Sequence, residues 1–270
     1  MTSAQAGLES EIAVHVSQIA VQLYTVRDQM KTPAEVAAAF EKIAKIGYTA
    51  VQFGGLPAMP VDQLAGMLSD SGLICCSTHG TGEASMLDEP APAAELARKL
   101  DCRSIAYPYP SGIKLDTVED ALAFARRLDA AGKVFHEAGI QFAYHNHSVE
   151  FQRLGGRLVL DVIYEETDPR YLQGEPDTYW IQYGGGDSVE WCRKLKGRLP
   201  LLHMKDYKIT PEDRPTFAEI GYGNLDWKKI VAAADDGGCQ WYIVEQDRCD
   251  GDPFDSLKLS FDYIRDTLCS

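Results

Sequence analysis

The sequence predicts a single-domain α/β protein folded as a (β/α)8 barrel. Short apolar runs alternate with capped, amphipathic helical patterns, which is typical of parallel strands joined by right-handed crossovers. The alternation occurs eight times within 270 residues, whereas a doubly wound sheet usually has about five or six strands. No Gly-x-Gly-x-x-Gly sequence follows the first apolar run, which argues further against a dinucleotide-binding fold.

The eight apolar runs are the predicted strands. They are short, rich in β-branched, aromatic and small residues, and bounded by glycine or polar residues. The sixth run is the poorest of them. The predicted strands cover residues 19–23, 49–53, 73–78, 103–107, 140–145, 171–177, 199–204 and 240–244.

Each predicted strand is followed by a helical pattern with start and stop signals. In the first, Thr32 is a capping residue, Pro33 occupies the first helical position, and Glu35 follows three residues after the cap. An apolar stripe continues at helical spacing until Gly47 ends it. The remaining helices are expected at residues 60–71, 91–100, 116–139, 158–166, 187–197, 226–235 and 253–268.

Composition and charge exclude several classes of function. The formal net charge is −14, with 26 basic and 40 acidic residues, and no basic stripe is evident, so binding to nucleic acid is not expected. No apolar run is long enough to span a membrane. The polar, acidic N-terminus lacks the pattern of a signal peptide. We expect residues 1–17 to be an extension outside a barrel domain that covers residues 18–270.

The cysteines indicate a reducing compartment. They are an odd number, seven, at irregular spacing, and no Cys-x-x-Cys is present. We interpret them as reduced thiols of a cytoplasmic protein that serve mostly as small core residues.

Histidines cluster at the predicted carboxyl ends of strands, where barrel enzymes place their working groups. Four of the six lie there: His79, His145, His147 and His203. A single histidine at this position could be structural, but four on one rim favour a functional site.

Carboxylates also lie at or just after the predicted carboxyl ends of strands. Glu150 lies just past the fifth predicted strand, Asp177 ends the sixth and Glu245 follows the eighth, while His203 lies in the seventh. Converging carboxylates in a packed barrel mouth require a compensating cation. A divalent metal such as Mn²⁺, Mg²⁺, Co²⁺ or Zn²⁺ would suit these ligands. The alternative is a set of separate rim salt bridges with Lys205 and nearby arginines.

Five motifs resemble the sugar phosphate isomerase/epimerase family, whose members have xylose isomerase-like TIM barrels. The resemblance runs in order through most of the chain, and relatives include ketose 3-epimerases, hydroxypyruvate isomerases, inosose dehydratases and abasic-site endonucleases. The motifs are VQLYTVRD (residues 21–28), YHNHSVEF (144–151), LLHMKDY (201–207), IGYGNLDW (220–227) and IVEQD (243–247).

The resemblance implies a metal held by Glu, Asp, His and Glu from the fifth to the eighth strand. Asp177, His203 and Glu245 match the last three positions. Many epimerases have Glu at the end of the fifth strand, where this chain has His145. Glu150 is the nearest carboxylate, and we expect it to be the first ligand.

The expected chemistry is removal of a proton beside a carbonyl polarised by the metal. His145 and Glu245 are the candidate proton carriers, and His147 is the next, because strand residues two apart face the same way. Lys205 could stabilise a developing oxyanion, or simply pair with a rim carboxylate.

The remaining site candidates would bind substrate. His79 is expected to hydrogen-bond it, with Gln22 and Tyr24 as weaker candidates, and Trp180 to pack against the apolar face of a sugar. The glycines of residues 220–224 could approach a phosphate, but a plain turn without a basic cluster is the stronger interpretation.

The sequence therefore predicts a metal-dependent isomerase or epimerase of a small keto-sugar or polyol. A lyase that uses the same site, by inosose-type dehydration or 3-keto-glycoside elimination, is the close alternative. A non-catalytic sugar-binding barrel is a weaker one, and a nuclease is disfavoured by the negative charge. A homo-oligomer is possible, because exposed barrel faces often pair.

Overall fold

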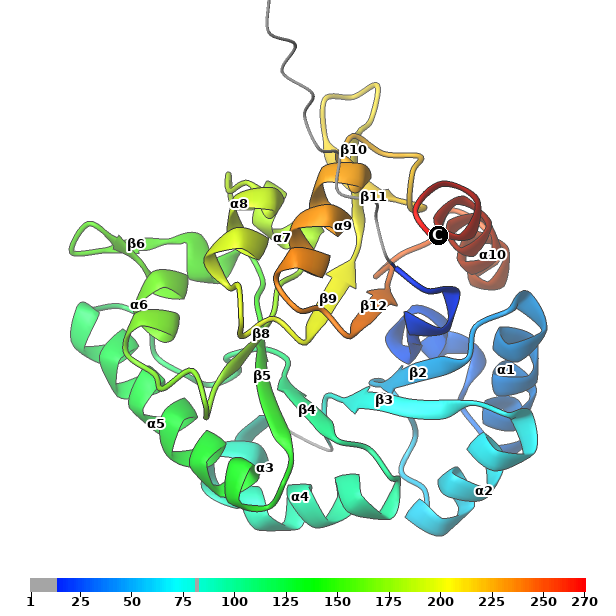
Figure 1. Cartoon of the computed structure of the whole chain (residues 1–270), viewed down its shortest axis with the longest axis horizontal. Helices are drawn as coiled ribbons and strands as arrows, with labels where there is room; N and C mark the ends of the chain where they lie inside the picture. The colour runs from blue at the N-terminus through cyan, green and yellow to red at the C-terminus, as the bar shows by residue number, and fades with distance from the viewer. Residues whose placement is uncertain (1–13, 81–82) are drawn as a thin grey trace, which may run out of the picture.

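Eight parallel strands form the barrel in the computed structural model, which describes residues 14–80 and 83–270 (Figure 1). The strand order is β8-β5-β4-β3-β2-β1-β12-β9. The two ends of this sheet meet after β8. The His203 amide donates to the Pro176 carbonyl at 3.0 Å, and the backbones of Asp177 and His203 form an isolated parallel β-bridge. The predicted barrel is confirmed. Its strands are β1 (Ile19–Gln22), β2 (Ala50–Phe53), β3 (Ile74–Thr78), β4 (Ser104–Tyr107), β5 (Gln141–His145), β8 (Gln173–Glu175), β9 (Leu201–Met204) and β12 (Trp241–Val244).

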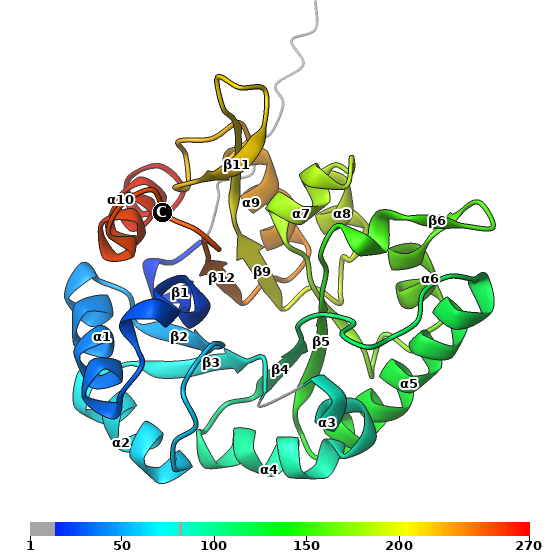
Figure 2. The same cartoon turned by 180° about the vertical axis from the view of Figure 1, so that it is seen from behind.

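Helices surround the strands in both views (Figures 1 and 2). The predicted cap at Thr32 forms, because its side chain accepts from the Glu35 amide. In the helix expected from residue 116, the Thr117 side chain accepts from the Asp120 amide. The helices that follow the eight strands in turn are α1 (Pro33–Ile46), α2 (Val61–Ser71), α4 (Pro90–Lys99), α5 (Val118–Glu137), α6 (Val159–Glu165), α8 (Ser188–Lys194), α9 (Trp227–Asp236) and α10 (Pro253–Thr267).

Several short elements were not predicted. The sixth strand ends at Glu175 instead of continuing to Asp177, because the Asp177 side chain accepts from the Trp180 amide and caps a new helix. The additional elements are α3 (Glu83–Asp88), α7 (Thr178–Tyr183), the 3-10 helices η1 (Val16–Gln18), η2 (Leu23–Gln29) and η3 (Val149–Phe151), and the hairpins β6 (Arg153–Leu154) with β7 (Arg157–Leu158) and β10 (Asp206–Ile209) with β11 (Pro215–Ala218).

The barrel interior has two layers that differ in polarity. A buried apolar cluster of mostly small residues fills one layer: Ala20, Ala50, Cys76, Ala106, Ala143, Leu201 and Ile243. Two residues further along five of these strands, buried polar side chains form the next layer: Gln22, Gln52, His145, His203 and Glu245. Since strand side chains alternate with a period of two, the second layer lies above the first, at the carboxyl ends of the strands.

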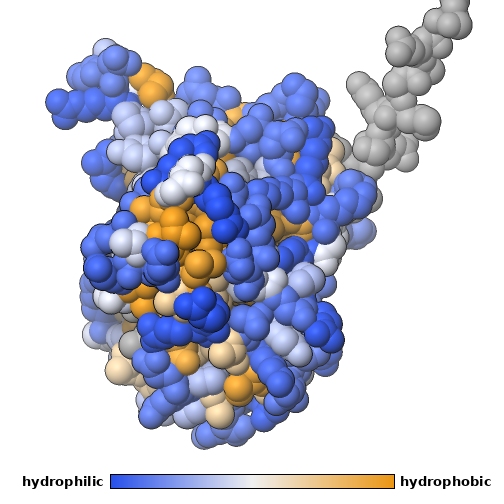
Figure 3. Space-filling view, turned by 90° about the vertical axis from the view of Figure 1, so that its left-hand side faces the viewer, coloured by the Kyte–Doolittle hydropathy of each residue, from blue (hydrophilic) through white to orange (hydrophobic). Residues whose placement is uncertain are grey.

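The outer surface carries mainly hydrophilic residues on the side shown in Figure 3, with separate hydrophobic patches between them. Within residues 14–80 and 83–270, no helix has the length and apolar character of a membrane span. All seven cysteines are free thiols, and five of them are buried. Most of the predicted extension, residues 1–13, lies outside the described residues, so the boundary after residue 17 stays a prediction.

Candidate metal centre and active site

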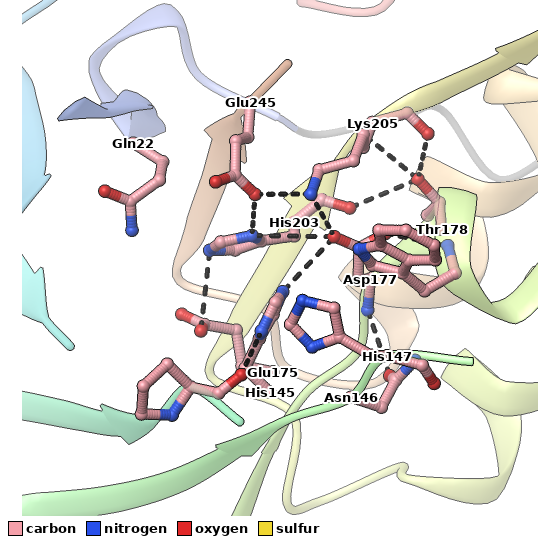
Figure 4. A network of polar contacts seen from close by, with 12 residues as sticks. Gln22, His145, Asn146, His147, Glu175, Asp177, Thr178, His203, Lys205 and Glu245 are labelled. Atoms are coloured by element: carbon pink, nitrogen blue, oxygen red, sulfur yellow. Dashed lines mark hydrogen bonds and ion pairs between the residues drawn. The ribbon is translucent and has the colours of Figure 1, made fainter. Parts of the chain in front are cut away.

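Four buried side chains from neighbouring strands converge at the mouth of the barrel (Figure 4). His145 ends β5, Asp177 follows β8, His203 lies in β9 and Glu245 follows β12. Each offers one ligand atom, and these four atoms all lie within 4.8 Å of one another. The parallel strands bring together residues that are up to 100 positions apart in the sequence.

The distances within this group define a compact pocket of nitrogen and oxygen donors. His203 Nδ1 lies 3.1 Å from Glu245 Oε2 and 3.8 Å from Asp177 Oδ2. His145 Nε2 lies 3.2 Å from Asp177 Oδ2. Two imidazoles and two carboxylates suit Mn²⁺, Co²⁺ or Zn²⁺ and are less favourable for Mg²⁺, which prefers oxygen ligands. The donor set therefore fits a divalent transition metal.

Lys205 already provides one positive charge to this group. Its ammonium Nζ lies 2.7 Å from Glu245 Oε2, 3.0 Å from Asp177 Oδ2 and 3.3 Å from Asp247 Oδ2, and the side chain is 1% exposed. Burial alone would lower the pKa of Lys205, but the three carboxylates outweigh burial and raise it. The alternative expected from the sequence, a lysine paired with the rim carboxylates, thus coexists with the four-ligand arrangement.

The carboxylates are held ionised by their neighbours. Burial raises the pKa of Asp177, but Lys205 and His145 outweigh burial and lower it to about 2. The pKa of Glu245 is also lowered, because Lys205 and His203 outweigh its burial. Conversely, burial lowers the pKa of His145, but the hydrogen bond to Asp177 prevails and raises it to about 9. Without a metal, His145 and Lys205 therefore carry the compensating charge.

Glu150 does not join this group, contrary to our expectation. Its carboxylate accepts hydrogen bonds from the Tyr144 hydroxyl at 2.6 Å and from the His147 amide at 2.9 Å, and it is fully buried. Tyr144 and His145 are consecutive strand residues and face opposite sides of β5. Glu150 lies in η3, after the strand, and its side chain is on the same face of β5 as that of Tyr144. His145 occupies the place that we assigned to Glu150.

A second polar network, which the sequence analysis missed, lies beside the first group. Glu175 Oε2 lies 3.0 Å from His79 Nε2, and the Gln52 amide donates to Glu175 Oε1 at 2.5 Å. His79, His145 and Glu175 also have ligand atoms within 4.8 Å of one another. The signals in the sequence were the spacings: Glu175 stands two residues before Asp177, and Gln52 two residues after the inward-facing Ala50.

Gln52 sets the orientation of the His203 ring. Since the Gln52 Nε2 atom donates to Glu175 and Ser77, its Oε1 atom must accept, and it lies 2.6 Å from His203 Nε2. His203 therefore carries a proton on Nε2, and its Nδ1 atom points toward Asp177 and Glu245. Such an outer hydrogen bond is the usual way in which a protein orients a metal-binding histidine.

The residues predicted to be catalytic or to bind substrate lie around one cavity of about 940 Å³, except Gln22. His79, His145, His147, Trp180, Lys205 and Glu245 line it, together with Tyr24. Gln22 instead lies in the buried layer, where its Nε2 atom donates to Gln52 at 2.6 Å. The structure therefore places Gln22 under the site, as a support for Gln52.

His147 lies against two aromatic rings at the cavity wall. Its ring centroid is 5.1 Å from that of Trp180 and 4.9 Å from that of Tyr109. Burial, reinforced by the positive charges of His145 and Lys205, lowers the pKa of His147 to about 2. His147 is therefore a neutral imidazole, and its Nδ1 atom has no hydrogen-bond partner among the described residues.

The glycine-rich segment of residues 220–224 serves as a turn. The Asp206 carboxylate accepts from the amides of Gly221 and Gly223 and from Trp227 Nε1 at 2.9, 3.1 and 2.7 Å. These amides are therefore occupied within the protein, which favours the turn over the phosphate-binding interpretation.

Comparisons with known proteins agree with the fold. A family model described as xylose isomerase-like TIM barrel matches residues 40–267. The inosose dehydratase of Geobacillus thermodenitrificans is 27% identical over 157 residues, which are 52% of this chain and 52% of the relative. That of Clostridium tetani is 24% identical over 167 residues, 56% of this chain and 55% of the relative. The matches thus span about half the length of these curated relatives.

Solved structures show the same barrel at low sequence identity. A sugar phosphate isomerase/epimerase from Parabacteroides distasonis superposes with a TM-score of 0.80 at 22% identity, covering 98% of this chain and 99% of that one. D-psicose 3-epimerase from Clostridium cellulolyticum superposes with a TM-score of 0.70 at 15% identity, covering 94% and 100%.

Proposed function

Because this chain belongs to the xylose isomerase-like TIM barrel family, we propose that it is a metal-dependent isomerase or epimerase of a small keto-sugar or polyol. The observation that carries the proposal is the buried group of His145, Asp177, His203 and Glu245 beside a cavity of about 940 Å³. Lys205 already compensates part of the negative charge, so the support for a metal is the arrangement: four donor atoms within 4.8 Å of one another at the carboxyl ends of barrel strands, where barrel enzymes place their working groups.

The four residues of this group would hold a divalent cation. When bound, the cation would polarise a substrate carbonyl and acidify the adjacent C–H bond. Mn²⁺, Co²⁺ and Zn²⁺ are the preferred candidates on the basis of the two imidazoles. Glu150 is left out of the ligand set, since its two oxygens accept from Tyr144 and His147.

The chain itself supplies proton transfer and charge stabilisation. Glu245 lines the cavity and is the proposed proton carrier, because a carboxylate that gives one oxygen to a cation keeps a second one. His145, the other candidate from the sequence, is kept only as a ligand: its Nε2 atom would face the cation, and its Nδ1 atom donates to the Pro108 carbonyl at 3.1 Å. The ammonium of Lys205, which also lines the cavity, would donate to an oxygen on which negative charge develops. The neutral His147 and the paired His79 would hydrogen-bond substrate hydroxyls, and Trp180 would cover the apolar face of the sugar ring.

Exchange with solvent deuterium tests this proposal. The protein is incubated with Mn²⁺ and a panel of keto-sugars and inososes in D₂O, and the products are analysed by NMR and mass spectrometry. Deuterium at an inverted or newly reduced carbon without loss of mass from the skeleton supports isomerisation or epimerisation. A protein that binds no metal and exchanges no C–H proton would instead be a sugar-binding barrel without catalysis.

Dehydration is the second candidate function, and the similarity to inosose dehydratases favours it. Glu245 would remove the same proton and form the same carbanion-like species, and Lys205 would donate a proton to a departing hydroxyl. Loss of water in the deuterium experiment would distinguish this reaction from the first. Under either reaction the partner is a small sugar-like molecule, and a cytoplasmic location, a homo-oligomeric state and a barrel domain of residues 18–270 remain part of the proposal.

A further inference from the structure

The cavity that contains the candidate site extends well beyond the metal-binding group. Its volume of about 940 Å³ is near the upper end of the range of about 300–1,000 Å³ for pockets that enclose drug-sized ligands. One polyol ring at the four ligands would occupy only part of this space. The rest of the cavity is therefore available to another part of the ligand.

The two parts of the cavity differ in chemistry. The first part contains the charged groups and lies at the barrel mouth. Among the described residues that line the cavity, the ionisable ones are His79, His145, His147, Lys205, Glu245, Asp247, Tyr24 and Tyr109. The second part, which we call the apolar arm, lies between the loop after β2, α2 and α4. It is lined by Leu56, Met59, Leu64, Leu96 and Leu100.

The segment after β2 forms one wall of the apolar arm. A Cβ atom at Gly54 would lie 2.5 Å from Gln22 Oε1, and Gly55 has a φ of +71° beside the Tyr24 ring. Two consecutive glycines thus let the chain turn closely over Gln22 and Tyr24. The following Leu56 and Met59 are half-buried and face the cavity.

We infer that the natural substrate joins a sugar or polyol to an apolar substituent, such as an aromatic aglycone, which binds in the apolar arm. The inference rests on the proposed function, because it places the sugar at the metal-binding group. A free polyol would leave the apolar arm in contact with water alone, whereas an apolar substituent would remove this surface from water. The occupant is part of the substrate, since the arm and the site form one continuous cavity.

Binding of two glycosides that differ only in the substituent tests the inference. Methyl β-D-glucoside and phenyl β-D-glucoside are titrated separately into the full-length protein with Mn²⁺ by calorimetry. We expect the phenyl glycoside to bind about tenfold to a hundredfold more tightly, as burial of one aromatic ring allows. Equal affinities would overturn the inference.

Variants locate the effect in the apolar arm. Leu96→Ser, at a half-buried position of α4, is expected to remove most of the preference for the phenyl glycoside while the metal content stays stoichiometric. Leu259→Ser is the matched control, because Leu259 is an exposed leucine of α10 outside the cavity lining. A preference that survives in Leu96→Ser, or disappears in Leu259→Ser, would place the phenyl group elsewhere and contradict the inference.

Metal content separates this inference from the proposed function. If Mn²⁺ does not bind but the phenyl preference persists and depends on Leu96, the arm is an apolar binding site and the catalytic proposal fails. If Mn²⁺ binds and keto-sugars turn over without any phenyl preference, the catalytic proposal stands and the arm does not select the substrate.

Discussion

The first and second halves of the barrel share one architecture but differ in the polar groups that they contribute. In β1 and β2, the buried positions above the small-residue layer hold the neutral amides Gln22 and Gln52. In β5, β9 and the end of β12, the corresponding positions hold His145, His203 and Glu245. The same strand geometry thus produces a neutral wall in one half and an ionised one in the other.

This difference teaches that the fold decides where side chains meet, while the sequence of each half decides what they can do together. The ionised half can bind a cation, because its strands are adjacent in the order β5-β8 and β9-β12, with β8 and β9 closing the barrel. The neutral half supports it through Gln52 and opens into the apolar arm. Under the two proposals made above, cation binding and the choice of substrate would therefore depend on different parts of the chain.

The largest effect is expected from removing a ligand in the ionised half. His203→Ala or Glu245→Gln should abolish both stoichiometric metal binding and activity, because each removes a donor from a group of four. Elemental analysis after dialysis against Mn²⁺ measures the first effect, and circular dichroism verifies the fold. Retention of full metal by either variant would show that the ligand set is assigned incorrectly.

The choice between His145 and Glu150 as the ligand near β5 can be decided in the same way. His145→Ala should lose metal, whereas Glu150→Gln should keep it. Glu150→Gln should instead lower the free energy of unfolding by about 1–3 kcal/mol, because one of two buried donors loses its acceptor. Urea unfolding measures the second effect. The reverse pattern, with metal lost only in Glu150→Gln, would restore our original expectation.

A smaller effect is expected from the neutral half. Gln52→Leu should weaken metal binding by about 10- to 100-fold, because His203 loses the acceptor that orients its ring. Gln22→Leu is the matched comparison, since Gln22 contacts Gln52 and not the metal-binding group. The dissociation constant for Mn²⁺, measured by competition with a chelator, should rise less in Gln22→Leu than in Gln52→Leu. Equal losses in both variants would indicate general disruption of the buried layer.

The last expected effect is on the pH dependence of stability in the metal-free protein. The pKa of His145 is raised from 6.5 to about 9, so its interaction with Asp177 stabilises the fold below about pH 6.5, and this contribution is lost as pH rises through 9. The loss should be at most about 3 kcal/mol. Urea unfolding between pH 6 and 10 in the presence of a chelator measures it.

His145→Gln should flatten this part of the pH profile, since it removes the titrating group. Saturating Mn²⁺ should flatten it as well, because a ligating imidazole is neutral. A wild-type profile that stays flat in the metal-free protein would show that His145 is not charged there.

The barrel was predictable because its signals are local. Thr32 caps its helix as Pro33 and Glu35 indicated, and strand periodicity placed Asp177, His203 and Glu245 at one rim, where the structure brings them together. The position of Glu150 was not predictable, because it depends on how η3 turns after β5. A carboxylate five residues beyond a strand residue can lie on either face of the sheet.

The buried network was missed for a different reason. Gln52 and Glu175 have no motif of their own, and their roles arise only when the barrel closes and brings β2 and β8 across its interior. Inward-facing polar residues can be recognised from alternation with the small inner layer, but only after each strand's inner face is known. The polar interior is therefore harder to infer than the rim.

The buried ammonium of Lys205 has a consequence for how tightly any metal can bind. Lys205 Nζ lies within 3.0 Å of both Glu245 and Asp177, so an incoming ion meets carboxylates that are already neutralised. The measured affinity for a metal ion will therefore include the free energy of separating the Lys205 ammonium from these two carboxylates. Asp247 lies 3.3 Å from the same ammonium, so the Lys205 side chain can pair with Asp247 when a metal ion displaces it from the other two carboxylates.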